Sequence, residues 1–170
     1  MATAARNTTP ISNFEASPQV MNDPQYFDAK VHNSKATVEI AAADNDADIF
    51  AIVPVHSSWA LKDILIINDA ITVGTDYNIG LYTQDGNGGI TNADENCYAD
   101  AVAMSTARTA WTSVKHGILD QALVNQQVWQ DAGAAADPND WYYLCLTAVT
   151  VGTAAGTISL SVDHTRVGGA

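Results

Sequence analysis

Two stretches, Lys62-Asp-Ile-Leu-Ile-Ile-Asn-Asp69 and Tyr77-Asn-Ile-Gly-Leu-Tyr-Thr-Gln84, decide the fold of this chain. The first has an unbroken run of large aliphatic residues, which is typical of a central strand in a packed sheet. The second alternates large apolar residues with small or polar ones, which is also a strand pattern. Gly80 inside that strand predicts a bulge or a close neighbouring backbone. A Gly-rich turn is expected to follow at residues 85–89.

Further strands are expected on both sides of these two. Residues 37–42 alternate and predict a half-buried strand, whereas the apolar run 49–53, which ends at Pro54, predicts a strand buried on both sides. Later in the chain, residues 141–150 are rich in aromatics and residues 157–165 alternate clearly. These two strands are expected to pair as an antiparallel hairpin.

Two segments predict short helices. Residues 92–99 begin with Asn and carry Glu three positions later, which is a capping-box pattern. Residues 119–131 have a rough helical spacing of apolar side chains, and Gly133 is a suitable residue to stop that helix. Residues 101–117 show no clear period, and within them Trp111 is expected to be buried.

These elements add up to a mainly β protein. We expect an antiparallel β-sandwich or jelly-roll-like domain with one or two short helices over residues 36–170. Residues 1–35 are polar and without a lasting hydrophobic period, which predicts an extended N-terminal arm. The arm is either a disordered terminus or a segment that orders against a neighbouring subunit. Its spaced hydrophobic side chains favour the second alternative and are the candidate interface with a neighbouring subunit: Ile11, Phe14, Val20, Tyr26 and Phe27.

Composition limits the classes of function. The chain has 170 residues, which favours one domain, and 47% hydrophobic residues, which excludes general disorder. Its formal charge is −12, from 19 acidic and seven basic residues. That charge argues against binding to nucleic acid and against docking on an anionic membrane. The sequence shows no signal peptide or apolar membrane span, so we expect synthesis in a cytoplasm.

The two cysteines are expected to be reduced, because disulfides are rare in that compartment. Cys145 lies in an apolar strand and should pack as a small hydrophobic residue. The sequence gives Cys97 no clear place. A disulfide between the two is the less favoured alternative.

The sequence contains no catalytic motif that we can identify. Its four histidines lie far apart and lack ligand spacing, and His164, at a strand end, is expected to be structural. The triplet His56-Ser57-Ser58 has no identifiable acidic partner. We therefore predict no enzyme activity, no catalytic residue and no cofactor.

Two acidic loops contain residues that could bind a cation. Asp44, Asp46 and Asp48 alternate as oxygen ligands would, but the Gly and Glu of a calcium-binding loop are absent. Asp85-Gly-Asn-Gly could also hold a cation. Ordinary turn chemistry explains both loops, so no metal site is predicted.

The order of several segments carries a resemblance to a known group of proteins. These segments are Leu65–Ala70, Tyr77–Tyr82, Asp85-Gly86, Asp94–Asp100, Trp129–Gly133, Asp137–Tyr142 and Ala155–Leu160. Over residues 36–166 the chain resembles small virion proteins of tailed phages. Such proteins look like β-sandwich decoration or cement proteins that coat capsids in many copies. The pattern contains no catalytic residue, and the arm lies outside it.

The resemblance implies a non-enzymatic structural protein of a phage virion. It implies a capsid decoration (cement) protein that binds the outer capsid surface and stabilises the shell. The expected partners are the major capsid protein and further copies of the chain, in a homo-oligomer for which the resemblance suggests a trimer. No nucleic acid and no membrane are expected as partners. The protein would be made in the host cytoplasm and end on the outer surface of the virion.

Two alternatives stay open at the level of sequence. A head-fibre or tail adhesin that binds host surface glycans would show exposed aromatics on one face, and Trp59, Trp111, Trp141 and Tyr142 are the candidates, although most are expected to pack in the core. A hydrolase on a sandwich scaffold would need an acid–base pair, which we cannot identify.

Overall fold

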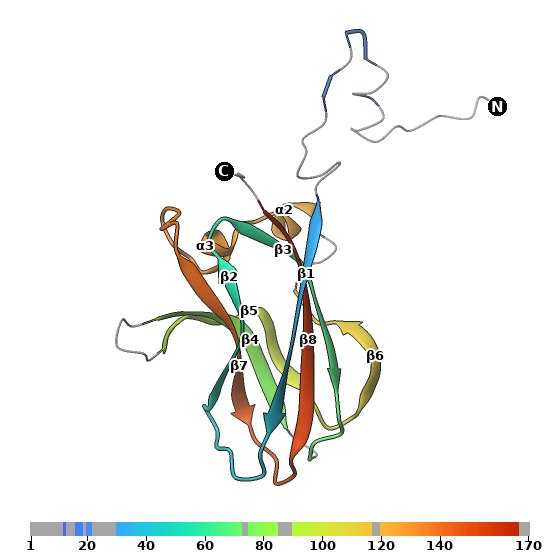
Figure 1. The fold of residues 1–170 in the computed structure, drawn as a ribbon, viewed down its shortest axis with the longest axis vertical. Coiled ribbons are helices and arrows are strands. Elements are labelled where there is room, and N and C mark those ends of the chain that lie inside the picture. The colour runs from blue at the N-terminus through green and yellow to red at the C-terminus, as the bar shows by residue number, and fades with distance from the viewer. Residues whose placement is uncertain are drawn as a thin grey trace, which may run out of the picture. The chain divides into compact units, whose positions relative to one another are not determined.

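The computed structural model divides the chain into two compact units, Met1–Lys30 and Val31–Ala170. It describes residues 12, 16–18, 20–21, 30–72, 75–84, 90–116 and 120–166. Within the described part of the second unit, eight strands form two antiparallel sheets of four strands (Figure 1). The predicted class, an antiparallel β-sandwich or jelly-roll-like domain with short helices, is confirmed as a β-sandwich.

The chain crosses between the sheets at almost every connection. The first sheet has the strand order β1 (Val31–Ile40), β8 (Gly156–Arg166), β3 (Trp59–Asn68) and β6 (Arg108–Ser113). The second sheet has the order β2 (Ile49–His56), β7 (Trp141–Thr150), β4 (Asp76–Gln84) and β5 (Ile90–Ala103). Among the strands of the described ranges, β4 and β5 are the one consecutive pair that is hydrogen-bonded together.

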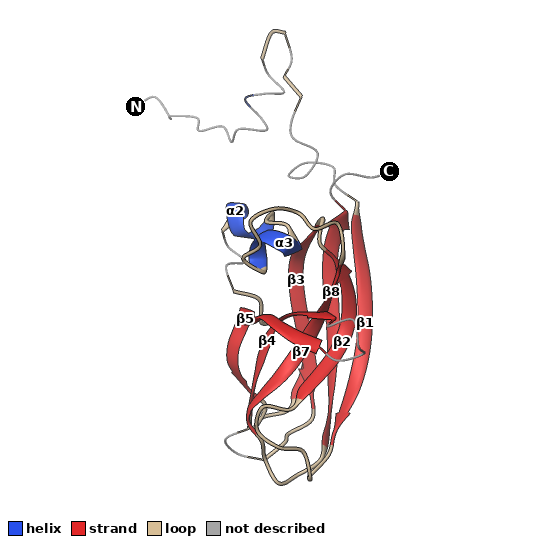
Figure 2. Ribbon diagram, turned by 90° about the vertical axis from the view of Figure 1, so that its left-hand side faces the viewer, coloured by secondary structure: helices blue, strands red, loops and turns tan. Residues whose placement is uncertain are grey.

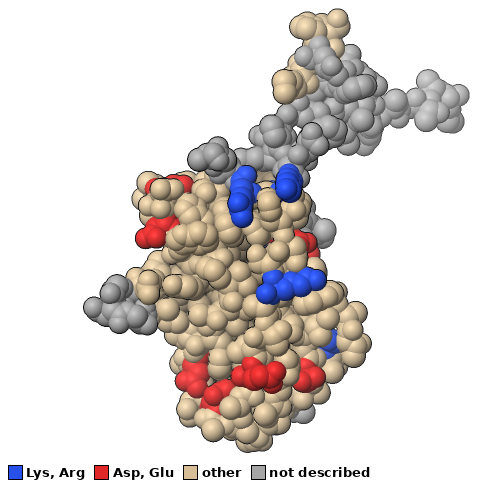
Figure 3. Space-filling model, in the orientation of Figure 1, with Lys and Arg blue, Asp and Glu red and all other residues tan. Residues whose placement is uncertain are grey.

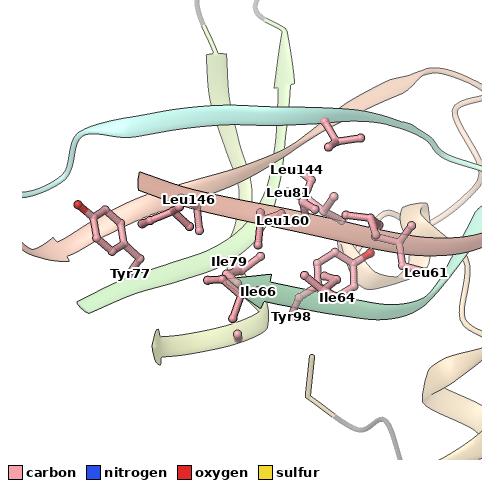
Figure 4. Packing of buried hydrophobic residues seen from close by; sticks show 14 of the residues in the cluster. Leu61, Ile64, Ile66, Tyr77, Ile79, Leu81, Tyr98, Leu144, Leu146 and Leu160 are labelled. Atoms are coloured by element: carbon pink, nitrogen blue, oxygen red, sulfur yellow. The ribbon is translucent and has the colours of Figure 1, made fainter. Parts of the chain in front are cut away.

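The two stretches that decide the fold are inner strands of different sheets. β3 lies between β8 and β6, and β4 lies between β7 and β5. Their apolar faces meet in the core, where Ile66 of β3 lies beside Ile79 of β4 (Figure 4). Both side chains are fully buried. The prediction that these runs form central strands is confirmed.

The predicted hairpin between residues 141–150 and 157–165 is wrong, although both segments are strands. β7 pairs with β2 and β4, whereas β8 pairs with β1 and β3. Each strand has one apolar face, and placing the strands in opposite sheets lets Leu144 and Leu160 share one core. Alternation identifies a strand and its buried face but does not identify its partner.

The helix predicted over residues 92–99 is also wrong, since these residues belong to β5. The local signal is present as a side-chain hydrogen bond from Asn92 Nδ2 to Glu95 Oε2, at 3.5 Å. Pairing with β4 prevails over it, and the register jumps where Ile79 faces Ala99 and Leu81 faces Asp94. The extra residues of β5 bulge over Gly80.

The prediction for Gly80 is confirmed by that bulge. A Cβ atom at this position would lie 2.2 Å from the carbonyl oxygen of Asp94 and 2.4 Å from that of Glu95. Only glycine leaves room for backbone at such a distance.

Three further predictions are adjusted by the sheet edges. β1 begins at Val31 rather than Thr37. β2 is an edge strand that is buried on one side only, and it runs through Pro54, which is tolerated there because an edge strand does not need every N–H. Trp111 lies on edge strand β6 and is 40% exposed, so the prediction that it is buried is wrong.

The helical segment is shorter than predicted. In place of one helix over residues 119–131 there are two single turns, α2 (Gln121–Val124) and α3 (Val128–Asp131), which lie together at one end of the sandwich (Figure 2). Gly133 follows with φ of +70°, as expected of a helix stop. None of the helices in the described ranges is long and apolar enough to span a membrane.

Both cysteines are free thiols, so the alternative of a disulfide is not realised. Cys145 is fully buried, as predicted, and burial raises the pKa of its thiol to about 12. Cys97 lies half-buried in the bulged part of β5. Burial raises the pKa of the Cys97 thiol as well, so neither thiol is activated as a nucleophile.

Candidate functional site

Aromatic and cationic side chains gather at the end of the sandwich where β2 turns into β3. We define this aromatic cluster as His32, His56, Trp59, Trp141, His164 and Arg166. Three cross-strand pairs build it: His32 faces His164, Trp59 faces Arg166, and His56 faces Trp141. The first two pairs belong to one sheet and the third to the other, so the cluster joins the sheets.

The rings of the cluster are held in defined orientations. Trp59 stacks on His164, with ring centroids 4.2 Å apart and an interplanar angle of 10°. Trp141 meets Trp59 edge to face at 5.4 Å and 81°. The Arg166 guanidinium carbon lies 5.3 Å from the centroid of Trp59. Edge-to-face and stacked contacts of this kind each add stability beyond the area that they bury.

A buried serine fixes the chain around the cluster. The backbone N–H of Ser57 donates to the carbonyl of Asp140 at 2.9 Å, and the Asp140 N–H donates to the Ser57 hydroxyl at 3.1 Å. The Ser57 carbonyl accepts from the Trp129 N–H at 3.1 Å. The β2–β3 turn is therefore tied both to α3 and to the residue before Trp141.

His164 is the buried centre of the cluster. It is 2% exposed, and neither of its ring nitrogens has a hydrogen-bond partner within the described structure. Burial lowers the pKa of its imidazole, the backbone of Val162 opposes this effect, and His32 and Arg166 lower the pKa further. A buried ring stacked on Trp59 is what we expected of a structural histidine.

Trp141 is the accessible part of the cluster. It is 49% exposed, whereas Trp59 beneath it is half-buried. Asp137, an exposed carboxylate, lies near Ser57 and His56, and its pKa is lowered mainly by a hydrogen bond from the Ser57 hydroxyl. The exposed indole of Trp141 can stack on a ligand or on a partner side chain.

The cluster contains a histidine beside a serine. His56 Nδ1 and Ser58 Oγ are 2.9 Å apart, and the Ser58 N–H donates to the same nitrogen at 3.3 Å. The acidic residue near this triplet, which the sequence did not reveal, is Asp137, whose carboxylate accepts a hydrogen bond from the Ser57 hydroxyl. Among the described residues, no carboxylate forms a hydrogen bond with the His56 ring.

A second group of polar side chains lies buried under the helices. The Tyr98 hydroxyl donates to Asp131 Oδ2 at 2.8 Å, and Lys115 Nζ lies 5.6 Å from the Tyr98 ring centroid. Burial raises the pKa of Asp131 and lowers that of Lys115. Lys115 is only 6% exposed and Tyr98 only 1%, so this group joins α3 to β5 rather than meeting a ligand.

The acidic residues weighed as cation ligands hold loops instead. Asp44 accepts from the Ala41 N–H at 2.7 Å, and Asp46 accepts from the Val151 N–H at 2.9 Å. No group of three or more potential metal ligands comes together in the ranges that the structure describes. Residues 85–89, the other candidate loop, lie outside those ranges.

The structure brings together only some of the residues that the sequence singled out. Of the arm residues, Ile11, Phe14, Tyr26 and Phe27 lie outside the described residues, and Val20 is 50% exposed. Of the four candidate aromatics, Trp59 and Trp141 meet in the cluster. Trp111 lies apart on β6 beneath Lys35, whose Nζ is 5.3 Å from its centroid, and Tyr142 is buried.

Sequence reasoning missed His32 and Arg166 as members of the cluster. Each becomes a member only through its register, opposite His164 or Trp59. The one usable signal was position, because both stand at the outer ends of alternating strands.

Comparison with known proteins finds solved structures that have a similar fold. No protein-family profile matches the sequence, and no curated protein sequence matches it. Two solved structures share the fold. A chain in the capsid of Ralstonia phage GP4 matches with a TM-score of 0.60 and 12% identity, over 82% of this chain and 86% of that one. A chain in the capsid asymmetric unit of cyanophage Pam1 matches with a TM-score of 0.54 and 13% identity, with the same coverage.

Proposed function

We propose that this chain is a non-enzymatic structural protein of a phage virion. In this proposal it is a decoration (cement) protein that binds the outer surface of the capsid and stabilises the shell. The observation that carries the proposal is the shared fold with chains from two phage capsids, across most of the length of each. The resemblance read from the sequence points to the same class of protein.

The architecture supports this role. Eight strands wound alternately between two sheets are the arrangement of jelly rolls, which recur in viral capsid domains. The charge of −12 suits a surface that faces solvent and repels other particles better than one that meets packaged DNA. Figure 3 shows a group of acidic side chains at the lower end of the described surface and further acidic side chains beside the basic ones at the upper end.

The proposed partners are the major capsid protein and further copies of the chain, which on the resemblance would form trimers. The N-terminal arm was predicted over residues 1–35, and the start of β1 at Val31 shortens it to residues 1–30. This arm is proposed to contact the capsid or a neighbouring subunit through Ile11, Phe14, Val20, Tyr26 and Phe27. Many copies on a symmetric shell would make such contacts collectively strong, even where each is weak.

Sedimentation with capsids that lack this chain tests the proposal. We expect purified protein to pellet with the capsids up to a fixed number of copies per shell, and to raise the temperature at which the shells open. Protein that stays in the supernatant would contradict the proposal. Virions made without the chain should keep intact but weaker heads, and a complete absence of heads would instead indicate a shell-forming subunit.

Deletion of residues 1–30 tests the arm separately. This deletion leaves β1 whole, because that strand begins at Val31. We expect the shortened chain to fold and to occupy fewer capsid sites. Unchanged occupancy together with unchanged shell stability would refute a bridging role for the arm.

One observation favours a second function, an adhesin that binds host surface glycans. The exposed Trp141, supported edge to face by Trp59, has the character of a sugar-stacking platform. Trp141→Ala should then abolish binding to host cells and leave capsid binding unchanged. The opposite result would place Trp141 in the capsid contact and remove the adhesin from consideration.

A further inference from the structure

The four edges of the sandwich are not protected equally against strand addition. β2 has Pro54 and a register shift, and β5 has three register shifts against β4. β6 has only six residues and a shift against β3. Proline, bulges, short length and charged side chains are the usual ways to protect an edge. β1 has no proline and no bulge, its ten residues run in unbroken register with β8, and its two charged side chains are the exposed Lys35 and Glu39.

Apolar side chains near the free edge of β1 are partly exposed to solvent. Among the described residues, no strand pairs with the side of β1 that faces away from β8. Ala36 and Val38 point toward the core yet remain only half-buried. Their neighbours on β8, Leu160 and Ile158, are 0% and 1% exposed. One more strand at this edge would cover the two half-buried side chains.

We propose that β1 of a second copy of this chain occupies that edge, antiparallel to the first β1, about a two-fold axis at Thr37. In this register Lys35 of each copy faces Glu39 of the other, and Ala36 faces Val38. Because of the two-fold symmetry each pair occurs twice, so the contact contains two ion pairs and two apolar pairs and is self-complementary. Residues 34, 36, 38 and 40 keep to the core side.

Neighbouring registers are less favourable. A shift of the axis by half a residue would place core-facing side chains opposite outward-facing ones, which the pleat forbids. An axis at Lys35 or at Glu39 would set like charges directly opposite, and an axis at Ala36 would leave Lys35 facing Thr37. Only the axis at Thr37 pairs both charges.

The existing contacts of these side chains are compatible with pairing. Thr37 Oγ1 is 2.8 Å from Ser159 Oγ, and Glu39 accepts from the Thr157 hydroxyl at 3.0 Å. Both bonds run toward β8 and leave the free edge unobstructed. Lys35 must leave the face of Trp111, where its Nζ lies 5.3 Å from the ring centroid. The free energy lost with the cation–π contact is close to that gained with the ion pair to Glu39. The ion pairs therefore fix the register rather than add much affinity.

The inference does not rest on a capsid role. Because the contact has two-fold symmetry, it joins copies in pairs and is separate from any three-fold contact. It predicts a continuous eight-stranded sheet made from the first sheets of two copies.

Charge exchange tests the register. Sedimentation equilibrium of the full-length chain at low salt should show dimers, and Lys35→Glu or Glu39→Lys should weaken the dimer at least about tenfold, because each change turns two attractive pairs into repulsive ones. The double variant, Lys35→Glu with Glu39→Lys, restores both pairs and should recover the wild-type dimer. Full-length chain that stays monomeric, or a dimer that is indifferent to these changes, would overturn the proposal.

Cross-linking provides a second test. In the proposed register the two Thr37 residues face each other, within reach of a disulfide, so oxidation of Thr37→Cys should yield a covalent dimer. Asn33→Cys is the matched control, since it lies on the same outward face of β1 but far from the axis. Equal cross-linking of the two variants would refute the register. The wild-type chain measures any background from Cys97.

Discussion

The two ends of the sandwich use their polar residues in opposite ways. At the acidic end, carboxylates in the loop at residues 41–48 accept backbone N–H groups, and Asp46 bridges to Val151 in the facing loop. At the other end, the aromatic cluster has stacked rings, an unpaired buried His164 and a half-exposed Trp141. Figure 3 shows acidic side chains at the first of these ends, and others at the opposite end beside basic side chains.

The difference indicates which end is available for contact. Carboxylates that hold loops stabilise the fold and keep the acidic end solvated. Within the described ranges, the aromatic cluster presents the indole of Trp141 as an exposed surface. Partner binding should therefore be more sensitive to changes at the aromatic end, and loop order to changes at the acidic end.

The largest effect is expected inside the aromatic cluster. Trp59→Ala removes the ring that contacts His164, Trp141 and Arg166. Because Trp59 is half-buried, the loss in the free energy of unfolding should be about 2–3 kcal/mol, at or below the lower end for a buried aromatic. Trp141→Ala, at the exposed rim, should cost about 1 kcal/mol or less. Denaturant unfolding of both variants measures the two losses in free energy. Equal losses would contradict the view that Trp59 supports the cluster while Trp141 lies at its exposed rim.

At the acidic end, Gly152→Ala should have the next largest effect. A Cβ at this position would lie 2.5 Å from Thr72 Cβ and 2.3 Å from Thr75 Oγ1. Since a Thr Cβ moves only with its backbone, we expect a loss of about 1–3 kcal/mol from overpacking. Thermal unfolding measures it. Ala154→Ser, at an exposed position of the same loop, is the control and should leave the midpoint unchanged.

Asp46→Ala should have a smaller effect, about 1 kcal/mol, because it removes one hydrogen bond between two loops. Asp46→Asn keeps an acceptor and should lose less. Hydrogen exchange of the Val151 amide gives the local readout. Exchange that is equally slow in all three proteins would mean that the carboxylate does not hold the loop.

The smallest effect on stability is expected when acid protonates the imidazole of His164. Burial holds its pKa below the ordinary 6.5, and the groups around it are His32, Arg166 and Asp163. The unfolded chain therefore takes up the proton first, so this contribution to stability is complete above pH 6.5 and is lost as pH falls below it. His164→Phe keeps a stacked ring without a titrating group.

The melting midpoint measured against pH compares the two proteins. The wild-type midpoint should fall relative to that of His164→Phe as pH drops below 6.5. Parallel curves would show that the His164 imidazole is not held neutral by the fold.

Local patterns predicted the strands well because alternation follows from a single buried face. The stretches around Ile66 and Ile79 became inner strands as expected, and Gly80 marked a bulge. Partners were not predictable, because a strand such as β7 has the same alternation whether it pairs with β8 or packs against it. The capping-box signal at residues 92–99 failed because burial of Tyr98 and pairing with β4 outweigh one turn of helix.

The candidate site was predictable only in part, for the same reason. Trp59 and Trp141 stood out by residue type. His32 and His164 are far apart in sequence and meet only through the register of β1 with β8. The register between two distant strands cannot be predicted from the local pattern of either strand.

The measurement that tests the central claim most directly is an image of virions in which this chain is labelled. A gold-tagged antibody against the exposed acidic end should decorate the whole head, in many regularly spaced copies, and leave the tail bare. Label confined to the tail, or absent from intact particles, would contradict a decoration protein on the outer capsid surface.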